Sequence, residues 1–97
     1  MLKPSDALQG HREEIRRIVA EHRARNPRIF GSVLRGSDAE GSDLDILVDD
    51  TPETSLLDLA RIERELSALL GEPVDVRTPL DLPQTFRDQV VTEARPV

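Results

Sequence analysis

Three aspartates are the residues of this 97-residue chain whose type and spacing could carry chemistry. Asp43 and Asp45 stand two positions apart in a predicted strand, so their side chains point to the same face. Two carboxylates held this close repel each other unless a cation lies between them, and Mg²⁺ prefers such oxygen ligands. Asp75 lies on another predicted strand and joins the pair if the two strands are neighbours. We therefore expect Asp43, Asp45 and Asp75 to form a metal site for phosphoryl or nucleotidyl transfer.

A glycine-serine turn precedes the aspartates and could bind phosphate. Gly31 and Ser32 follow a short predicted strand, and a turn of this kind offers backbone N–H groups and a hydroxyl to an anion. Arg35 could bind the same triphosphate through its guanidinium group. Each feature alone is most often an ordinary turn or a solvated side chain, but Gly-Ser followed ten residues later by Asp-x-Asp is rare by chance. The combination predicts that Gly31, Ser32 and Arg35 bind nucleotide phosphates.

Alternating helices and strands would position these residues. Apolar residues recur at helical spacing in residues 5–24, 52–70 and 84–94. We expect Pro52 at the first position of the second helix and Phe86, Val90 and Val91 on the buried side of the third. Strands are expected at 28–30, 43–49 and 73–76, and a turn or short helix at 80–83. This order predicts one α/β (α+β) domain over residues 1–97, with a small sheet of about three strands flanked by helices.

Composition and charge exclude several classes of protein. The absence of cysteine excludes disulfides, thiolate nucleophiles and cysteine-type zinc sites. No apolar run approaches the roughly 18 residues of a membrane span, and the first residues do not resemble a signal peptide, so we expect a cytoplasmic protein with no membrane partner. The net charge is −6, with the acidic residues concentrated after position 28. This balance disfavours a nucleic acid polymer as a partner.

The remaining polar residues give weaker indications. The first 28 residues carry seven Lys or Arg against four Asp or Glu. The arginines at 12, 16, 17, 23 and 25 are most simply a solvated face, and alternatively a docking patch for an acidic partner or a contact to the triphosphate. We expect His11 and His22 to be surface or half-buried helix residues rather than metal ligands.

The segments Ile29–Gly36 and Ser42–Val48 closely resemble the minimal nucleotidyltransferases, small members of the DNA polymerase β superfamily. The resemblance extends over nearly the whole chain and implies the polymerase β-like fold, with a mixed sheet. It further implies that Asp43 and Asp45 bind two Mg²⁺ ions, and that Asp75 completes one metal site and helps to deprotonate the acceptor hydroxyl. Ser32 and the Gly31 backbone would hold the β- and γ-phosphates of ATP.

The same resemblance implies a partner. Members of this family are typically antitoxins encoded with HEPN-domain ribonuclease toxins. The chain is therefore expected to be a protein adenylyltransferase of a type VII-like toxin–antitoxin pair, which transfers AMP from ATP to a tyrosine hydroxyl of the toxin. Three other functions stay open: a non-catalytic antitoxin that neutralises its toxin by binding, a nucleotide-binding regulatory module, and a small-molecule nucleotidyltransferase.

Overall fold

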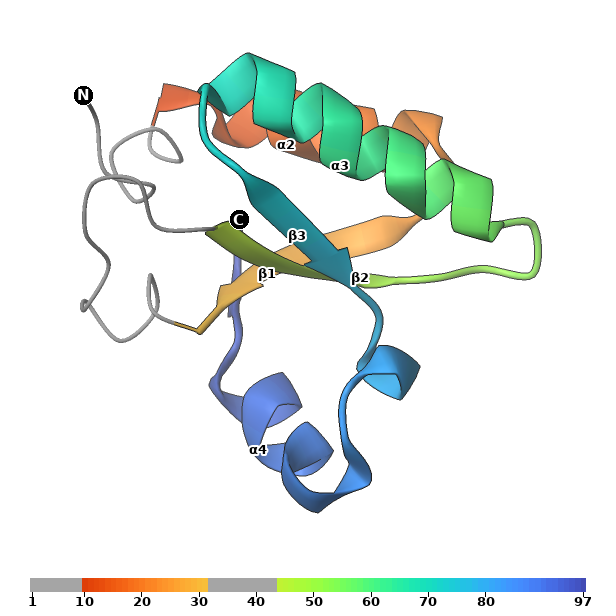
Figure 1. Cartoon of the computed structure of the whole chain (residues 1–97), viewed down its shortest axis with the longest axis vertical. Coiled ribbons are helices and arrows are strands. Elements are labelled where there is room, and N and C mark those ends of the chain that lie inside the picture. Colours follow the sequence, from red (N-terminus) through yellow and green to blue (C-terminus); the bar gives the residue numbers. More distant parts are fainter. Residues whose placement is uncertain (1–9, 32–43) are drawn as a thin grey trace.

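A four-stranded mixed sheet with helices on both of its faces forms the described part of the chain, residues 10–31 and 44–97 of the computed structural model (Figure 1). The strand order is β3-β2-β1-β4, in which β2 and β3 are parallel and the other pairs are antiparallel. In chain order the elements are α2 (Arg12–Glu21), β1 (Arg25–Phe30), β2 (Leu44–Asp49), α3 (Leu56–Leu70), β3 (Val74–Arg77), the 3₁₀ helix η1 (Pro79–Asp81), α4 (Gln84–Glu93) and β4 (Arg95–Pro96). The predicted fold class is confirmed, with one strand more than the sequence indicated.

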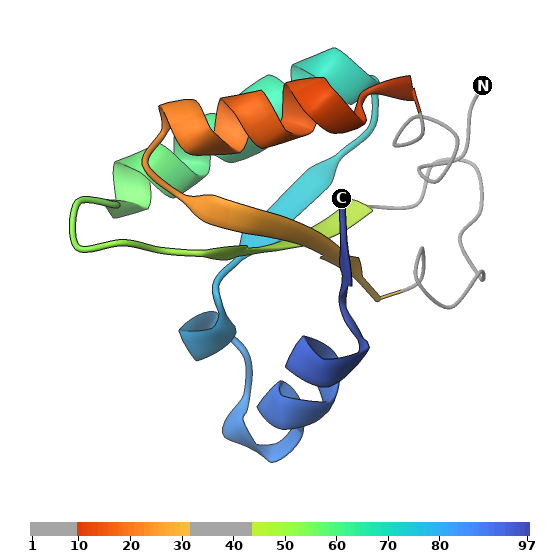
Figure 2. The same cartoon turned by 180° about the vertical axis from the view of Figure 1, so that it is seen from behind.

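The main core lies between the sheet and the helices α2 and α3. Both helices lie on the same face of the sheet, whereas η1 and α4 lie on the other (Figures 1 and 2). Every second residue of β2 and β3 points toward α2 and α3, as strand alternation requires. The core is aliphatic, and its buried side chains include Leu44, Ile46, Val48, Val74 and Val76 from the strands and Ile15, Ile18, Val19, Ile62, Leu66 and Leu70 from the helices. Each contributes about 1.5–3 kcal/mol by leaving water.

The helix α3 begins later than the sequence predicted. Pro52 is not its first residue, because Ser55 caps the helix: Ser55 Oγ accepts from the Asp58 N–H at 3.1 Å, and Asp58 Oδ2 accepts from the Ser55 N–H at 2.9 Å. This reciprocal capping box satisfies two backbone donors at the helix start. Leu56 and Leu57 consequently lie at the exposed end of the helix, with 83% and 57% of their surface accessible.

The end of α2 and the start of β1 also differ from the prediction. α2 ends at Glu21, and β1 begins at Arg25, before Pro27 rather than after it. A register irregularity between Arg25 and Arg28 accommodates the proline, which has no N–H to give to a strand. The first part of the predicted helix, residues 5–9, lies outside the described residues.

The last helix packs less deeply than predicted. α4 contains no buried residue, Phe86 is 44% exposed, and Val90 and Val91 are only half-buried. Instead, Arg87 ties α4 to η1, since its Nε donates to Pro79 O at 2.7 Å and its guanidinium also donates to Leu82 O at 2.9 Å. The prediction of an inward-facing Phe86 was wrong because polar contacts, not an apolar stripe, hold this helix.

The fourth strand is short. β4 pairs with Arg28 and Ile29 of β1, and Val97, which follows it, donates its N–H to Pro27 O at 3.0 Å. Val97 is 8% exposed and belongs to the core. None of the helices described is long and apolar enough to cross a membrane.

Candidate active site

Two of the predicted aspartates are direct neighbours in the sheet. Asp45 of β2 is aligned with Asp75 of β3 in the parallel register. Aligned residues of neighbouring strands point to the same face, about 5 Å apart. The residues on either side of each aspartate are buried under α2 and α3, so both carboxylates point to the opposite face of the sheet. Both aspartates are half-buried, while Asp43 lies outside the described residues.

Gly31 brings the end of β1 against the Asp45 carboxylate. Phe30, the residue before it, is aligned with Asp45 across the antiparallel pair of β1 and β2. Gly31 has a φ of +77°, a conformation that L side chains rarely adopt. A Cβ atom added to Gly31 would overlap Asp45 Oδ2 and would lie 3.3 Å from the carboxyl carbon. Only glycine therefore allows the backbone to approach this carboxylate so closely.

The predicted phosphate-binding turn is described only at its start. Ser32 and Arg35 lie outside the described residues. The described part nevertheless brings the start of that turn, at Gly31, to the same corner of the sheet as Asp45 and Asp75. We call these three residues the catalytic corner.

The catalytic corner suits a divalent cation bound together with a phosphate. Mg²⁺ in nucleotide enzymes is held by one or two carboxylates plus substrate phosphates, and it keeps several waters. Asp45 and Asp75 supply adjacent carboxylates, and the missing side chain at Gly31 lets the backbone at the start of the predicted phosphate-binding turn lie directly against Asp45. No group of three potential metal ligands occurs among the described residues, a search that does not include Asp43.

Phe30 is a neighbour of this corner that the motif did not indicate. It is half-buried and shares the face of Asp45 and Asp75, because aligned residues of paired strands point the same way. Strand alternation predicts that Ile29 and Phe30 point to opposite faces of the sheet. It does not indicate that β2 is the neighbouring strand, so the sequence did not place Phe30 beside Asp45.

The two histidines lie away from the catalytic corner, at the two ends of α2. His11 Nδ1 contacts the carboxylate of Glu14 at 3.3 Å, and His22 Nε2 pairs with Glu65 of α3. The pairing of His22 with Glu65 was not foreseen, since the two residues are 43 positions apart. It joins two helices and involves no other metal-binding side chain among the described residues.

The chain matches a protein family and several named relatives. The nucleotidyltransferase domain family matches residues 11–97. A Methanocaldococcus jannaschii protein, MJ0435, provisionally named a protein adenylyltransferase, is 40% identical over 77 residues, which make up 79% of this chain and 83% of that protein. The protein adenylyltransferase MntA of Thermococcus cleftensis is 42% identical over 69 residues, covering 71% of this chain and 67% of MntA.

Solved structures agree with these relationships. A structure described provisionally as a minimal nucleotidyltransferase is 41% identical, with a TM-score of 0.85, and the match covers 96% of this chain and 95% of that one. A toxin–antitoxin structure with AMP-PNP has a TM-score of 0.69 at 18% identity, over 96% of this chain and 71% of that one, which shows a shared fold. This chain therefore belongs to the nucleotidyltransferase domain family and, within it, to the minimal nucleotidyltransferases.

Proposed function

We propose that this minimal nucleotidyltransferase is an antitoxin that transfers AMP from ATP to a hydroxyl group of its toxin. The observation that carries the proposal is the alignment of Asp45 with Asp75 beside the close approach of Gly31. Relatives more than a third identical are named protein adenylyltransferases, and a protein with the same fold is described as a toxin–antitoxin with AMP-PNP. The family resemblance further supports a HEPN ribonuclease as the toxin and a tyrosine as the acceptor.

Each site residue has a role in this proposal. Asp43, Asp45 and Asp75 would hold Mg²⁺, and Gly31, Ser32 and Arg35 would hold the β- and γ-phosphates of ATP. Bound Mg²⁺ supplies charge neutralisation at the triphosphate and lowers the pKa of a coordinated hydroxyl. The close approach of Gly31 to Asp45 would keep the phosphate-binding turn beside the carboxylates.

The proposed transfer is a single substitution at phosphorus. The oxygen of the acceptor hydroxyl forms a bond to the α-phosphorus, and the bond from that phosphorus to the bridging oxygen of the β-phosphate breaks. Pyrophosphate leaves, and Asp75 accepts the hydroxyl proton. The products are an AMP ester of the acceptor and pyrophosphate.

A protein acceptor suits the size of the chain. A small-molecule site usually buries most of its ligand in a pocket. A chain of 97 residues that also binds a triphosphate has little room for a second enclosed pocket. An open corner at a sheet edge can instead receive a side chain that a second protein presents.

Labelled ATP tests this proposal. The protein is incubated with Mg²⁺, the product of its neighbouring gene, and ATP labelled at either the α- or the γ-phosphate. We expect the α-label on the partner and no γ-label, with an AMP ester on one tyrosine by mass spectrometry. Asp75→Asn should abolish labelling, whereas Asp88→Asn, which changes an exposed carboxylate on α4, should leave it unchanged.

The other functions give different results. A partner that binds but carries no label would indicate an antitoxin that acts by binding alone. Label on a small hydroxylated compound, with none on the partner, would indicate a small-molecule nucleotidyltransferase.

A further inference from the structure

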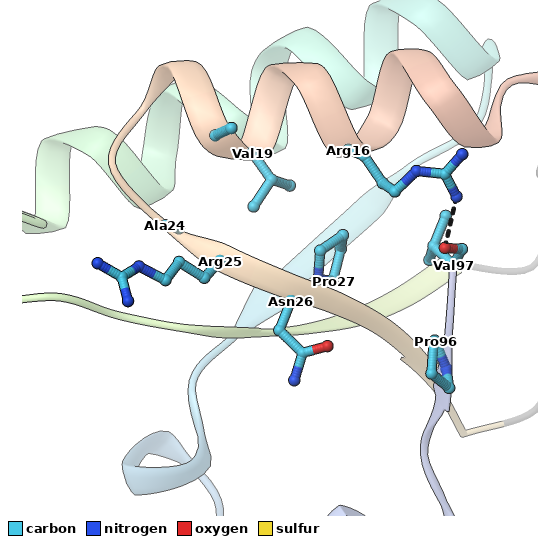
Figure 3. Close-up of a pocket in the computed structure, with 9 residues that line it drawn as sticks. Arg16, Val19, Ala24, Arg25, Asn26, Pro27, Pro96 and Val97 are labelled. Carbon is cyan, nitrogen blue, oxygen red and sulfur yellow. Dashed lines mark hydrogen bonds between the residues drawn. The ribbon is translucent and has the colours of Figure 1, made fainter.

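A groove begins at Arg25, the first residue of β1, at the end of the strand that is farther from Gly31. Two adjoining hollows of about 440 and 390 Å³ form it, and both are lined by Ala20, Ala24 and Arg25. The groove runs between the end of α2, the start of β1 and the residues of β4 (Figure 3). The groove extends along β1 from Arg25 to the level of Pro96, which is aligned with Arg28. Arg25 lies about 17 Å along the six-residue strand from Phe30, the residue before Gly31. We call this groove the arginine groove.

Three arginines lie at the rim of the arginine groove. Arg16, Arg23 and Arg25 line the hollows together with Glu53 and Val97. The Arg16 guanidinium donates to Val97 O at 2.7 Å and the Arg23 guanidinium donates to Asp58 at 3.4 Å. Arg25 is exposed and extends along the strand away from Arg16 (Figure 3), with no hydrogen-bond partner for its side chain among the described residues. Arg25 thus offers a cation to a binding partner on a chain of net charge −6.

The floor of the groove is apolar. Val19, Ala24 and Val97 are almost completely buried and form the floor, and Pro27 and Pro96 close it on the strand side. Figure 3 shows Val19 and Pro27 facing each other between the two arginines. An apolar floor beneath a cationic rim complements a peptide that carries both an apolar side chain and carboxylates.

The backbone of the groove is fixed in an unusual conformation. Arg23 and Asn26 have φ values of +67° and +54°, which non-glycine residues seldom adopt. Thr51 Oγ1 donates to Arg23 O at 3.0 Å, Thr54 Oγ1 also donates to Arg23 O, and Asn26 Nδ2 donates to Asp49 at 3.2 Å. These contacts hold the segment in place before any partner binds, which lowers the entropic cost of binding.

The sheet edges do not favour addition of a partner strand. On the outer side of β1, the short strand β4 pairs with Arg28 and Ile29, Val97 donates its N–H to Pro27 O, and Pro27 itself has no N–H to offer. At the opposite edge, the N–H groups of Val74 and Val76 donate to Ser67 Oγ at 3.1 Å and to Glu63 Oε2 at 3.0 Å. A partner therefore meets the arginine groove through side chains rather than by extending the sheet.

We propose that the arginine groove is a docking site for an acidic segment of the acceptor protein. An apolar side chain of that segment lies between Val19 and Pro96, and its carboxylates meet Arg16 and Arg25. The identity of the acceptor protein rests on the function proposed above. Docking along β1 positions the partner so that its hydroxyl reaches the catalytic corner beyond Phe30.

The same features disfavour a nucleic acid in this groove. No aromatic side chain lines the two hollows, so a base has no ring on which to stack.

Two variants test separately how the charge and the shape of the arginine groove contribute to partner binding. Arg25→Glu reverses one rim charge, and Ala20→Phe fills the hollow from an exposed position of α2. Arg61→Glu is the matched control, since Arg61 is exposed on α3 and does not line the groove. Calorimetry with the product of the neighbouring gene, at low and high salt, measures Kd, and α-labelled ATP measures transfer. Thermal melts confirm that each variant is folded.

We expect Arg25→Glu and Ala20→Phe to weaken binding about tenfold and to raise KM for the protein acceptor rather than to lower kcat. The effect of Arg25→Glu should shrink at high salt, whereas that of Ala20→Phe should persist. Arg61→Glu should bind as the wild-type protein does. A synthetic peptide copying the acidic segment of the partner should compete with the intact partner.

The outcomes distinguish this proposal from the proposed function. If Arg25→Glu and Ala20→Phe bind and label the partner normally, the docking site is overturned while AMP transfer stands. If both variants lose binding but the wild-type protein transfers no label, docking stands and AMP transfer is overturned. The docking site is also overturned if the wild-type protein does not bind this partner, or if a short single-stranded RNA binds instead and Arg25→Glu abolishes that binding.

Discussion

At the scale of single residues, Gly31 combines a left-handed backbone with a close contact to Asp45. Gly71 offers a matched control, because its φ of +70° is similar but no atom lies within 4 Å of an added Cβ. Each Gly→Ala change should cost about 1 kcal/mol of unfolding free energy through backbone strain. Gly31→Ala should in addition reduce AMP transfer at least tenfold, since its methyl group displaces the Asp45 carboxylate. Chemical denaturation and labelling assays on both variants measure the two effects.

Gly71→Ala should keep its activity at a temperature where it remains folded. Equal activity losses in both variants would mean that strain alone, rather than the contact with Asp45, explains the effect of Gly31→Ala.

Asp75 offers a second prediction at this scale. Like-charged carboxylates on adjacent strands repel each other in the absence of a cation. In EDTA, Asp75→Asn should therefore leave the melting temperature unchanged or raise it slightly, although the variant transfers no AMP. With Mg²⁺ and a non-hydrolysable ATP analogue, the wild-type protein should gain thermal stability and the variant should not. A loss of several kcal/mol in EDTA would show that Asp75 supports the fold instead.

The sequence predicts the face on which Asp45 and Asp75 lie, because their apolar neighbours indicate that both point away from the core. The predicted shared face of Asp43 and Asp45 stays a prediction, since Asp43 lies outside the described residues. The sequence does not predict the alignment of Asp45 with Asp75, because strand order depends on the crossover through α3. The contact between Gly31 and Asp45 is likewise a product of tertiary structure.

At the scale of elements, the capping box determines where α3 begins. Ser55→Ala removes the hydroxyl that accepts from the Asp58 N–H, so the free energy of unfolding should fall by about 1 kcal/mol. Ser67→Ala would not be a suitable control, because Ser67 Oγ accepts from Val74. Thr92→Ala on the exposed side of α4 should change stability by less than about 0.5 kcal/mol. Urea denaturation at neutral pH measures the free energy of unfolding of the wild-type protein, Ser55→Ala and Thr92→Ala. Equal values for the wild-type protein and Ser55→Ala would contradict the capping role.

The same capping box predicts a pH dependence. A hydrogen bond from the Ser55 backbone N–H, with smaller contributions from the Ser55 hydroxyl and Arg23, lowers the pKa of Asp58 below its ordinary value, although burial opposes this shift. A carboxyl with a lowered pKa stabilises the fold at neutral pH, and this contribution is lost as the pH falls below about 4. The free energy of unfolding of the wild-type protein should therefore fall more steeply between pH 5 and pH 3 than that of Asp58→Asn. Parallel slopes for the two proteins would show that Asp58 is not a source of acid sensitivity.

Several element boundaries were not predictable from local pattern. The proline at 52 suggested a helix start, but the polar pair Ser55 and Asp58 satisfies the free N–H groups, and the helix begins four residues later, at Leu56. The strand β4 is two residues long and carries no alternating pattern that could have indicated it. Pairing with β1 and burial of Val97 create it. Long amphipathic segments were predictable, whereas elements formed by tertiary contacts were not.

At the scale of the whole molecule, charge divides the chain into two regions. The arginine groove extends along β1 from Arg25, and the acidic catalytic corner lies beyond Phe30, at the other end of that strand. A partner with complementary charges is therefore oriented as it approaches, which links the function of the corner to that of the groove.

Crystallisation with Mn²⁺ and a non-hydrolysable ATP analogue tests most directly whether the catalytic corner is the site of transfer. Anomalous scattering locates the metal without reference to activity. The account predicts a Mn²⁺ peak about 2 Å from carboxylate oxygens of both Asp45 and Asp75, with the phosphates of the analogue beside Gly31. A structure in which the metal and the analogue occupy another part of the protein, while Asp45 and Asp75 contact neither, would contradict it.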